Sequence, residues 1–394
     1  MEELKEGWRK VKLGEIANLK YGKMPKKDKI KENGYPIFSG YRITGYYDEY
    51  MLEEEEIIVV ARGVGGTGDV KISPPKSFIT NLSIILLLKN DINKKFLYYL
   101  LKNKNLRILD SGSAQSQITI NDLKEYEIFL PNLKLQDKIA SILSLLDEKI
   151  ELNRKINQNL EETAQTLFKR WFIDFEFPNE EGKPYKSSGG KMIKSELGEI
   201  PERWRVGKLG EIIEINPKEN LKKLEKKIYI EMKCLSETSS IISEYYEREF
   251  TGTGTKFKNK DTLMARITPC LENGKIGYVN FLEDNDIGWG STEFNILRSQ
   301  NNIPKELSYF IARSKNFLDY AINNMNGSSG RQRVNGKILE EYDIVISPEN
   351  IYKKFGKVSN SIMNQIENNR KEIEKLQKLR DYLLPRLMNG EISV

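Results

Sequence analysis

An internal duplication constrains this chain more than any other feature of its sequence. Trp8–Ile16 recurs as Trp204–Ile212, at an offset of 196 residues. Further along, Tyr126–Ile128 recurs as Tyr342–Ile344, at an offset of 216 residues. Self-similarity of this kind indicates one structural unit used twice. We therefore expect two lobes that share a scaffold, with differing middle segments that provide two different working surfaces.

Each half is predicted to begin with strands and to end with a long helix. The runs Ile57–Val60 and Ser83–Leu88 are β-branched or apolar and are bounded by Gly, Pro and Asn, which favours buried strands. A short helix is expected at 94–105, with its counterpart at 305–316. The strands and short helices of each half together predict an α/β lobe.

The long helix that closes each half is predicted to form a coiled coil. Apolar and amide residues alternate spacings of four and three over four heptads, which is typical of a coiled-coil seam. In the first half these residues are Ile139, Leu143, Leu146, Ile150, Asn153, Asn157, Leu160, Ala164 and Leu167. In the second half they are Phe355, Ser359, Ile362, Ile366, Asn369, Ile373, Leu376, Arg380 and Leu383. The alternative is an amphipathic helix that lies on its own lobe.

The register of the coil can also be predicted. A pseudo-two-fold axis between the halves, perpendicular to the coil, makes the two helices antiparallel. Partners whose numbers sum to 526 then give apolar layers, namely Leu143 with Leu383, Ile150 with Leu376, Leu160 with Ile366, and Ala164 with Ile362. In this register Asn157 faces Asn369 near the centre, and a buried Asn pair penalises slipped registers.

The expected fold class is therefore α+β, with two pseudo-two-fold-related α/β lobes separated by an intramolecular antiparallel coiled coil. The expected boundaries are 1–135 for the first lobe, 136–177 for the first spacer helix, 178–193 for a linker, 194–350 for the second lobe and 351–394 for the second spacer helix. The linker is rich in Pro, Gly and Ser and is expected to be flexible. The first helix is expected to fray at Trp171–Ile173, and these residues to dock on a neighbouring domain.

Composition excludes several kinds of chemistry. The chain of 394 residues has no histidine, which excludes Ser-His-Asp and Cys-His mechanisms and histidine metal sites. Its two cysteines, Cys234 and Cys270, form no Cys-x-x-Cys motif, so neither a structural zinc site nor any other metal site is expected. The net charge of +6 permits a polyanionic partner. A charged N-terminus and the lack of a long apolar stretch predict a cytoplasmic protein without a membrane span.

Motifs for nucleotide or nucleic-acid chemistry are absent or lack their context. Gly63–Gly68 reads G-x-G-x-x-G after a strand, but a strand-like segment follows it where dinucleotide binding needs a helix. We therefore expect a hairpin loop there and no cofactor. The chain has no P-loop and no Asn-Pro-Pro-Tyr motif of an amino-methyltransferase. Glu231–Lys233 is the nearest match to a nuclease triplet, and the first half does not repeat it.

What remains is a pattern typical of nucleic-acid binding, in which basic, amide and aromatic side chains lie in glycine-rich loops. Arg and Gln make bidentate contacts to base edges, and Lys reaches phosphates. The candidates are Lys23, Tyr41, Arg42, Arg62, Gln115, Gln117, Lys256, Arg266, Lys275, Arg331 and Arg333. Arg62 and Arg266 rank highest because each follows an alanine just after a strand, so that the duplication repeats the pair. The alternative for each candidate is a solvated loop, or for the two arginines a structural role.

The order of these parts resembles the specificity subunit of type I restriction–modification systems, over essentially the whole chain. The resemblance rests on the Trp-x-x-x-x-Leu-Gly-Glu-Ile segment that opens each half and on a Gly-Ser-rich turn before Ile128–Pro131. It rests also on Leu167–Phe175, Gly290–Phe294 and the closing Leu384–Ile392. Pro131 and Gln136 match the early Pro and Gln of the family's long helices, whereas the second half has Pro348 and Tyr352.

The resemblance implies two target-recognition domains, each of which grips one part of a bipartite double-stranded DNA sequence. It also implies a non-catalytic chain whose partners are two methyltransferase (modification) subunits and the restriction/translocase subunits. Two rival functions remain open. One is a stand-alone DNA-binding or adaptor protein whose coil recruits a partner protein, and salt-dependent DNA affinity would separate the adaptor from a DNA reader. The other is a single-chain nuclease or methyltransferase, which turnover by the isolated chain would reveal.

Overall fold

The computed structural model describes residues 7–63, 66–89, 91–110, 116–328 and 330–394. It divides into two compact units. Unit 1 comprises the residues up to Ile150 together with Lys375–Val394, and unit 2 comprises Glu151–Glu374. The long helices α4 (Leu133–Phe172) and α8 (Glu349–Met388) each contribute residues to both units. The unit boundaries therefore fall within the two helices that the sequence predicts as separate spacer segments.

Unit 1 contains two small sheets and a strand pair. Its elements before α4 are β1 (Trp8–Lys12), α1 (Leu13–Ile16), β2 (Ala17–Tyr21), η1 (Lys27–Lys29), β3 (Tyr35–Phe38), β4 (Ile43–Tyr47), β5 (Ile57–Val60), β6 (Val70–Ile72), β7 (Phe78–Ile79), β8 (Ser83–Leu88), α2 (Lys94–Lys102), η2 (Leu106–Leu109), α3 (Ile120–Glu125) and β9 (Glu127–Pro131). One sheet has the order β2-β8-β5-β6 and the other β4-β3-β7, while β1 pairs with β9. The predicted strands Ile57–Val60 and Ser83–Leu88 are confirmed as β5 and β8.

Burial explains why these two runs form strands. All four residues of β5 are completely buried, and the strand lies between β8 and β6. A strand covered on both faces is selected by continuous β-branched residues rather than by alternation. The apolar face of α2, including Phe96 and Leu100, packs in the same core as β5 and β8. Burial of such side chains contributes about 1.5–3 kcal/mol each to folding.

Unit 2 repeats this topology with additions. Its elements between the long helices are β10 (Met192–Ser195), β11 (Gly198–Pro201), β12 (Arg205–Lys208), η3 (Leu209–Glu211), β13 (Ile213–Ile215), β14 (Lys226–Ile230), η4 (Met232–Cys234), β15 (Tyr246–Glu249), β16 (Thr255–Lys258), β17 (Thr262–Ala265), β18 (Ile276–Tyr278), β19 (Ile287–Gly290), β20 (Phe294–Ser299), α5 (Leu307–Arg313), α6 (Lys315–Asn323), α7 (Gly336–Glu340) and β21 (Asp343–Ile346). The sheet β13-β20-β17-β18 matches β2-β8-β5-β6, and β15-β14-β19-β16 matches β4-β3-β7 with β16 added. The predicted duplication is therefore a duplication of topology.

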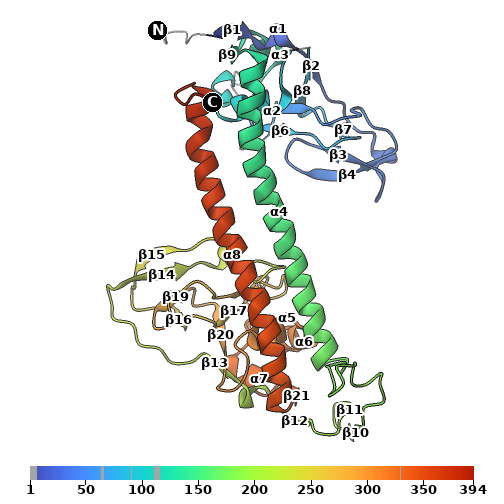
Figure 1. Cartoon of the computed structure of the whole chain (residues 1–394), viewed down its shortest axis with the longest axis vertical. Coiled ribbons are helices and arrows are strands. Elements are labelled where there is room, and N and C mark those ends of the chain that lie inside the picture. The colour runs from blue at the N-terminus through green and yellow to red at the C-terminus, as the bar shows by residue number, and fades with distance from the viewer. Residues whose placement is uncertain (1–6, 64–65, 90, 111–115, 329) are drawn as a thin grey trace. The chain divides into compact units, whose positions relative to one another are not determined.

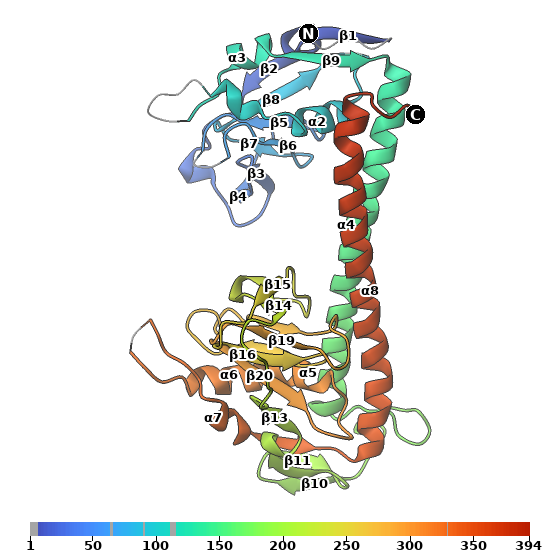
Figure 2. The same ribbon diagram turned by 90° about the vertical axis from the view of Figure 1, so that its left-hand side faces the viewer.

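In each unit, a stretch of α4 lies beside an antiparallel stretch of α8 (Figures 1 and 2). In unit 1, the Arg380 guanidinium lies 2.8 Å from the Asp147 carboxylate. In unit 2, Asn369 donates a hydrogen bond to Asn157 at 2.8 Å, and Asn153 donates to Glu372 at 2.8 Å. The residue numbers in each of these three pairs sum to within one of 526. The contacts within each unit thus follow the predicted antiparallel register.

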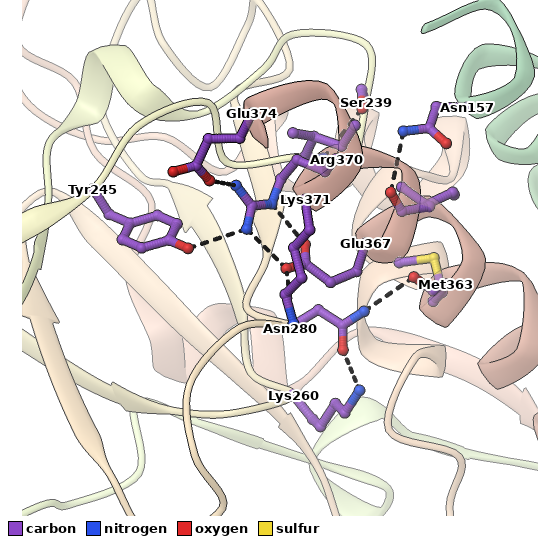
Figure 3. A network of polar contacts seen from close by, with 12 residues as sticks. Asn157, Ser239, Tyr245, Lys260, Asn280, Met363, Glu367, Arg370, Lys371 and Glu374 are labelled. Atoms are coloured by element: carbon purple, nitrogen blue, oxygen red, sulfur yellow. Dashed lines mark hydrogen bonds and ion pairs between the residues drawn. The ribbon is translucent and has the colours of Figure 1, made fainter. Parts of the chain in front are cut away.

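In unit 2, a polar cluster fixes α8 against the lobe (Figure 3). The Arg370 guanidinium donates to both oxygens of Glu367, at 2.8 and 2.9 Å, and to the Tyr245 hydroxyl at 3.1 Å. Beside it, Asn280 donates to the Met363 carbonyl at 3.0 Å and accepts from Lys260. Because these bonds join α8 to loops of the sheets, the helix and the lobe are positioned by one another.

The segment predicted to be a flexible linker is folded onto the lobe of unit 2. The Tyr185 ring stacks on Phe177 with ring centroids 4.6 Å apart, and the Tyr185 N–H donates to the Phe177 carbonyl at 2.9 Å. Phe177 in turn stacks on Trp204, and Trp171 packs in the same core without fraying from α4. Composition predicted flexibility, but the aromatic residues on either side of the Gly-Ser run give the segment a surface to bury.

Candidate nucleic-acid interface

In unit 1, three candidate residues lie in exposed turns beside the sheets. Lys23 follows β2, and its backbone N–H donates to the Ile79 carbonyl at 2.9 Å. Tyr41 and Arg42 lie in the turn between β3 and β4, where the Ser39 N–H and hydroxyl both donate to the Arg42 carbonyl at 3.1 Å. The turn is held by its backbone, which leaves the Arg42 side chain in solvent.

The glycine motif of unit 1 holds a tyrosine ring. A side chain at Gly63 or Gly66 would displace the Tyr41 ring or its hydroxyl, so glycine at both positions leaves room for this ring. Partial burial against these glycines raises the pKa of the Tyr41 hydroxyl, and the charge of Asp69 raises it further. Because β5 pairs antiparallel with β6, the expected hairpin is confirmed. Residues 64–65 lie outside the described residues.

Arg62 and Gln117 lie opposite each other in unit 1. They form an isolated antiparallel bridge just beyond β5, and the Gln117 N–H donates to Asp110 at 2.8 Å. The Arg62 side chain is exposed, and the Gln117 side chain is half-buried. The candidate Gln115 and the Gly-Ser residues before it lie outside the described residues.

In unit 2, two candidate arginines flank one carboxylate. The Arg333 guanidinium donates to both oxygens of Glu293, at 2.8 and 2.7 Å. These bonds lower the pKa of the Glu293 carboxyl, and the charge of Arg266 lowers it further. Among the described residues, the buried Arg266 Nε has no hydrogen-bond partner. The three side chains together carry a net positive charge beside the end of β17.

The backbone around Arg333 is fixed on both sides. Its N–H and carbonyl bond to Asn326 at 2.9 and 3.0 Å, and the Gln332 carbonyl accepts from the Thr268 N–H at 3.1 Å. These backbone bonds hold the main chain that carries Arg333 in place.

The remaining candidates of unit 2 are less concentrated. Lys275 lies opposite the end of β17, because its carbonyl accepts from the Ala265 N–H at 3.0 Å. Arg331 is exposed two residues before Arg333, next to residue 329, which is outside the described set. Lys256 lies on β16 in the other sheet, with its ammonium 5.3 Å from the centre of the Phe250 ring. The backbone contacts thus place Arg266, Lys275 and Arg333 around the end of β17, whereas Lys256 lies in the neighbouring sheet.

The predicted equivalence of Arg62 and Arg266 is wrong by one residue. Val60 is the residue of β5 that pairs with Ser83, the first residue of β8. Ala265 is the residue of β17 that pairs with Phe294, the first residue of β20. Ala265 therefore corresponds to Val60. Along extended backbone, a shift of one residue turns the side chain to the opposite face.

Backbone hydrogen bonds beyond the strands give the same correspondence. The Ala61 carbonyl accepts from the Ile118 N–H at 3.0 Å, and the Arg266 carbonyl accepts from the Val334 N–H at 2.9 Å. Arg266 thus stands where unit 1 has alanine. The shared Ala-Arg letters misled because β5 ends two residues before its arginine, whereas β17 ends one residue before.

The next bridge shows which side chains do correspond. Arg62 pairs with Gln117 in unit 1, and Ile267 pairs with Arg333 in unit 2, each through an isolated antiparallel bridge. Gln117 and Arg333 therefore occupy the same position in the two lobes. One is an amide and the other a guanidinium, and both can form two parallel hydrogen bonds.

Comparison with known proteins identifies the family. The family model described as "Type I restriction modification DNA specificity domain" matches residues 5–162 and 201–379. The chain belongs to this family. The chain is 31% identical over 323 residues to the type I restriction enzyme MjaIX specificity subunit of Methanocaldococcus jannaschii. The aligned region covers 78% of this chain and 71% of that protein. The MjaVIII specificity subunit of the same organism is 26% identical over 99% of this chain and 94% of its own length.

A solved structure has the same fold. The S subunit of the type I restriction–modification system from M. genitalium matches with a TM-score of 0.64 at 21% identity, over 98% of this chain and 97% of that one. The resemblance to type I specificity subunits is thus confirmed, and so is the architecture of two repeated lobes with long packed helices. Among the described residues of this specificity subunit, no helix is long and apolar enough to cross a membrane, and no three His, Cys, Asp or Glu side chains are grouped to hold a metal ion.

Sequence reasoning missed a half-buried arginine that holds two loops of unit 2. Arg313 of α5 donates to the backbone carbonyls of five residues at 2.6 to 3.0 Å. These residues are Ser236, Glu237, Ser239, Gly274 and Ile276. Arg313 thereby fixes the backbone on both sides of Lys275. No local pattern marks it, because its partners come from two distant loops.

A buried carboxylate connects the same cluster to the long helix α4. Glu161 accepts from the Ser240 N–H and hydroxyl at 3.1 and 2.7 Å, and from the Tyr309 hydroxyl at 2.5 Å. Arg313 Nε donates to the Tyr309 oxygen at 3.1 Å. Complete burial raises the pKa of the Tyr309 hydroxyl, so it stays protonated as the donor to Glu161. Each polar group in this buried chain of bonds has a partner, which makes the arrangement rigid.

Lysine-rich connections in both lobes were also overlooked. In unit 1, the segment between β2 and β3 exposes Lys26 and, at the start of η1, Lys27. In unit 2, the matching segment between β13 and β14 exposes Lys222 and Lys223. The density of lysine in the sequence was the available signal, since clustered cations are suited to phosphate contacts.

Proposed function

We propose that this specificity subunit recognises a bipartite double-stranded DNA sequence, with each lobe reading one half. The observation that carries the proposal is the pairing of one topology with two different sets of loop side chains. The strand orders correspond, yet the same bridge position holds Gln117 in one lobe and Arg333 in the other. A shared scaffold with different hydrogen-bonding groups at one position suits two lobes that read different bases.

The proposed contacts divide by chemistry into two classes. Flexible cations suit phosphates, which fix orientation, whereas Arg, Gln and aromatic side chains suit base edges. In unit 1 the proposed residues are Lys23, Tyr41, Arg42, Arg62 and Gln117, together with Gln115 from the sequence. In unit 2 they are Lys256, Arg266, Lys275, Arg331 and Arg333. Arg266 has a different place from that of Arg62, so we assign the two arginines no common role.

The long helices are proposed to set the separation of the two DNA half-sites and to provide the scaffold for partner subunits. In the proposed complex, two modification subunits transfer methyl groups and the restriction subunits translocate and cleave DNA. The specificity subunit itself is proposed to be non-catalytic and to use no cofactor. In support, the sequence contains no histidine and no nucleotide-binding motif in its required context.

The test is DNA binding and methylation by the complex with its modification subunits. The recognition sequence is first mapped from the methylated bases of a host that expresses the complex. Binding to a duplex with this sequence should exceed binding to a scrambled duplex by about 10³-fold or more. Affinity should also fall steeply with added salt.

Matched variants separate a specific contact from bulk charge. Lys256→Ala should weaken binding and reduce the salt dependence by about one released ion. Lys194→Ala removes an exposed lysine of β10, outside both the proposed interface and the long helices, and should leave binding unchanged. Equal affinity for both duplexes would contradict sequence recognition, and no DNA binding at all would contradict the proposal and favour an adaptor. Methylation by the purified chain without partners would contradict its non-catalytic role.

A further inference from the structure

The bridge position shared by the two lobes carries a more specific inference about base recognition, which rests on the proposed function. Arg333 and Gln117 follow different loops, yet each is paired through its backbone to the segment just past the central strand. Two different side chains on the same backbone frame allow the two lobes of one protein to read different bases.

Arg333 is held as an oriented fork. Its Nε and Nη2 donate to the two oxygens of Glu293, and its Nη1 donates to the Arg331 carbonyl at 3.2 Å. A guanidinium has five N–H groups, so one remains on each terminal nitrogen. Over a third of the Arg333 side chain is exposed, at 38%. The two remaining donors are therefore available to a ligand without breaking the ion pair.

The groups that orient the Arg333 guanidinium are themselves held in place. The Glu293 backbone N–H donates to the Ser291 hydroxyl at 3.1 Å, and its carbonyl accepts from the Arg266 N–H at 3.0 Å. Both main-chain groups of Arg333 are bonded to Asn326. A side chain held from two directions loses little conformational freedom on binding, which favours a directional contact over a diffuse one.

We propose that Arg333, oriented by Glu293, reads a guanine in one half-site, and that Gln117 reads an adenine at the corresponding position of the other. Two parallel donors match O6 and N7 of guanine, whereas the donor and acceptor of a glutamine amide match N7 and N6 of adenine. The Gln117 backbone is fixed through Asp110 and through its bridge to Arg62. The two residues share the ability to form two hydrogen bonds but not charge, because Gln117 is neutral. A phosphate contact needs only one donor and no paired acceptor, so it would not use the donor-and-acceptor pattern of the Gln117 amide.

The experiment exchanges the two side chains in the full complex with its modification subunits. After the wild-type recognition sequence is mapped, Arg333→Gln and Gln117→Arg are mapped in the same way. Arg333→Gln should replace one guanine by adenine in a single half-site. Gln117→Arg should replace one adenine by guanine in the other half-site. Arg333→Lys keeps the charge without the fork and should weaken binding to the wild-type sequence about tenfold to a hundredfold, with the loss confined to duplexes that carry the guanine.

Two further variants complete the test. Glu293→Gln should relax the preference for guanine while preserving sequence specificity elsewhere in the site. Arg203→Gln, at an exposed arginine of unit 2 outside the interface, should leave the recognition sequence unchanged. Tryptophan emission and thermal unfolding establish that each variant is folded, and if Arg333→Gln fails to fold, Arg333→Lys decides the result.

The possible outcomes separate this inference from the proposed function. If the wild-type complex shows no sequence preference, the proposed function fails. If it has a defined recognition sequence that Arg333→Lys and Gln117→Arg leave unchanged, only the assignment of these two residues fails. An equal loss of affinity on every duplex would make Arg333 a phosphate contact and would overturn the inference.

Discussion

The buried asparagine pair between the long helices offers a quantitative test of the structure. Asn157 and Asn369 are 5% and 6% exposed, and Asn369 donates to the Asn157 oxygen at 2.8 Å. Asn157 donates in turn to the Ile366 carbonyl at 3.1 Å. Replacing Asn369 by leucine leaves the Asn157 oxygen buried without its partner. We expect the free energy of unfolding to fall by about 1–3 kcal/mol, the penalty for one unsatisfied buried polar group.

The double variant should remove this penalty. Asn157→Leu combined with Asn369→Leu removes both polar groups and fills the layer with apolar side chains of similar shape. Such a replacement is nearly neutral or stabilising. Asn157→Leu alone should cost a similar amount, because it leaves the Asn369 amide without its acceptor, so the coupling free energy of the double-mutant cycle should be close to the sum of the two single losses. Asn368→Leu, at an exposed position on the same helix, is the matched control and should change stability by less than about 0.5 kcal/mol.

The assay is urea unfolding followed by tryptophan emission. Trp171, Trp204 and Trp289 belong to unit 2, whereas Trp8 is the remaining tryptophan of the chain and belongs to unit 1. In a Trp8→Phe background, emission reports unit 2, which contains the asparagine pair. Strictly additive losses in the double variant would refute the argument, because they would mean that the two amides do not satisfy each other.

Three further results are expected. Deleting one heptad from each long helix shortens the pair by about 10 Å, or about three base pairs of B-DNA. The wild-type sequence should then no longer be methylated, and any mapped site should have a different spacer. An unchanged recognition sequence would show that the helices do not set the separation of the half-sites. Arg313→Met removes one hydrogen-bond donor from each of five carbonyls. It should destabilise unit 2 by about 2–4 kcal/mol in the same urea assay. An effect below about 0.5 kcal/mol would contradict the role of Arg313 in holding the loops. Finally, Arg333 lowers the pKa of Glu293 below its value in the unfolded chain, so the ion pair should stabilise the fold above about pH 4.5 and lose this effect as the pH falls through the folded pKa. The difference in urea midpoint between wild type and Glu293→Gln should then be constant from pH 8 to about 5.5 and shrink in more acidic buffer, whereas a difference that grows on acidification would show the opposite sign of linkage.

Part of the fold follows from sequence because local periodicity determines it. The fully buried run Ile57–Val60 could form only a covered strand, and its boundaries agree with β5. The heptads of the long helices identified the interface, and the antiparallel register followed from placing apolar residues opposite each other. The Asn157–Asn369 contact agrees with that register because a helix has a constant rise, so one correct layer determines the others.

The candidate site was predictable only in part. The sequence identified residue types suited to DNA, and the structure places Arg266, Lys275 and Arg333 around the end of β17. The sequence could not show that Arg333 is bonded to Glu293, because the two residues lie 40 positions apart and no pattern links them. The prediction of a flexible linker was wrong for a related reason. Tyr185 stacks on the Phe177 ring, and composition does not show which rings come into contact.

The sequence by itself determined the duplication, the central strands and the helix register, since each depends on repetition or spacing along the chain. Only the tertiary structure decided which residues of the two lobes correspond. Arg62 and Arg266 match in letters, but the strand ends place Arg266 with Ala61, while the isolated bridges place Gln117 with Arg333. The physical reason is that a side chain's face depends on its backbone hydrogen bonds to distant strands. An offset of one residue in those bonds turns the side chain to the opposite face and leaves no trace in the local sequence.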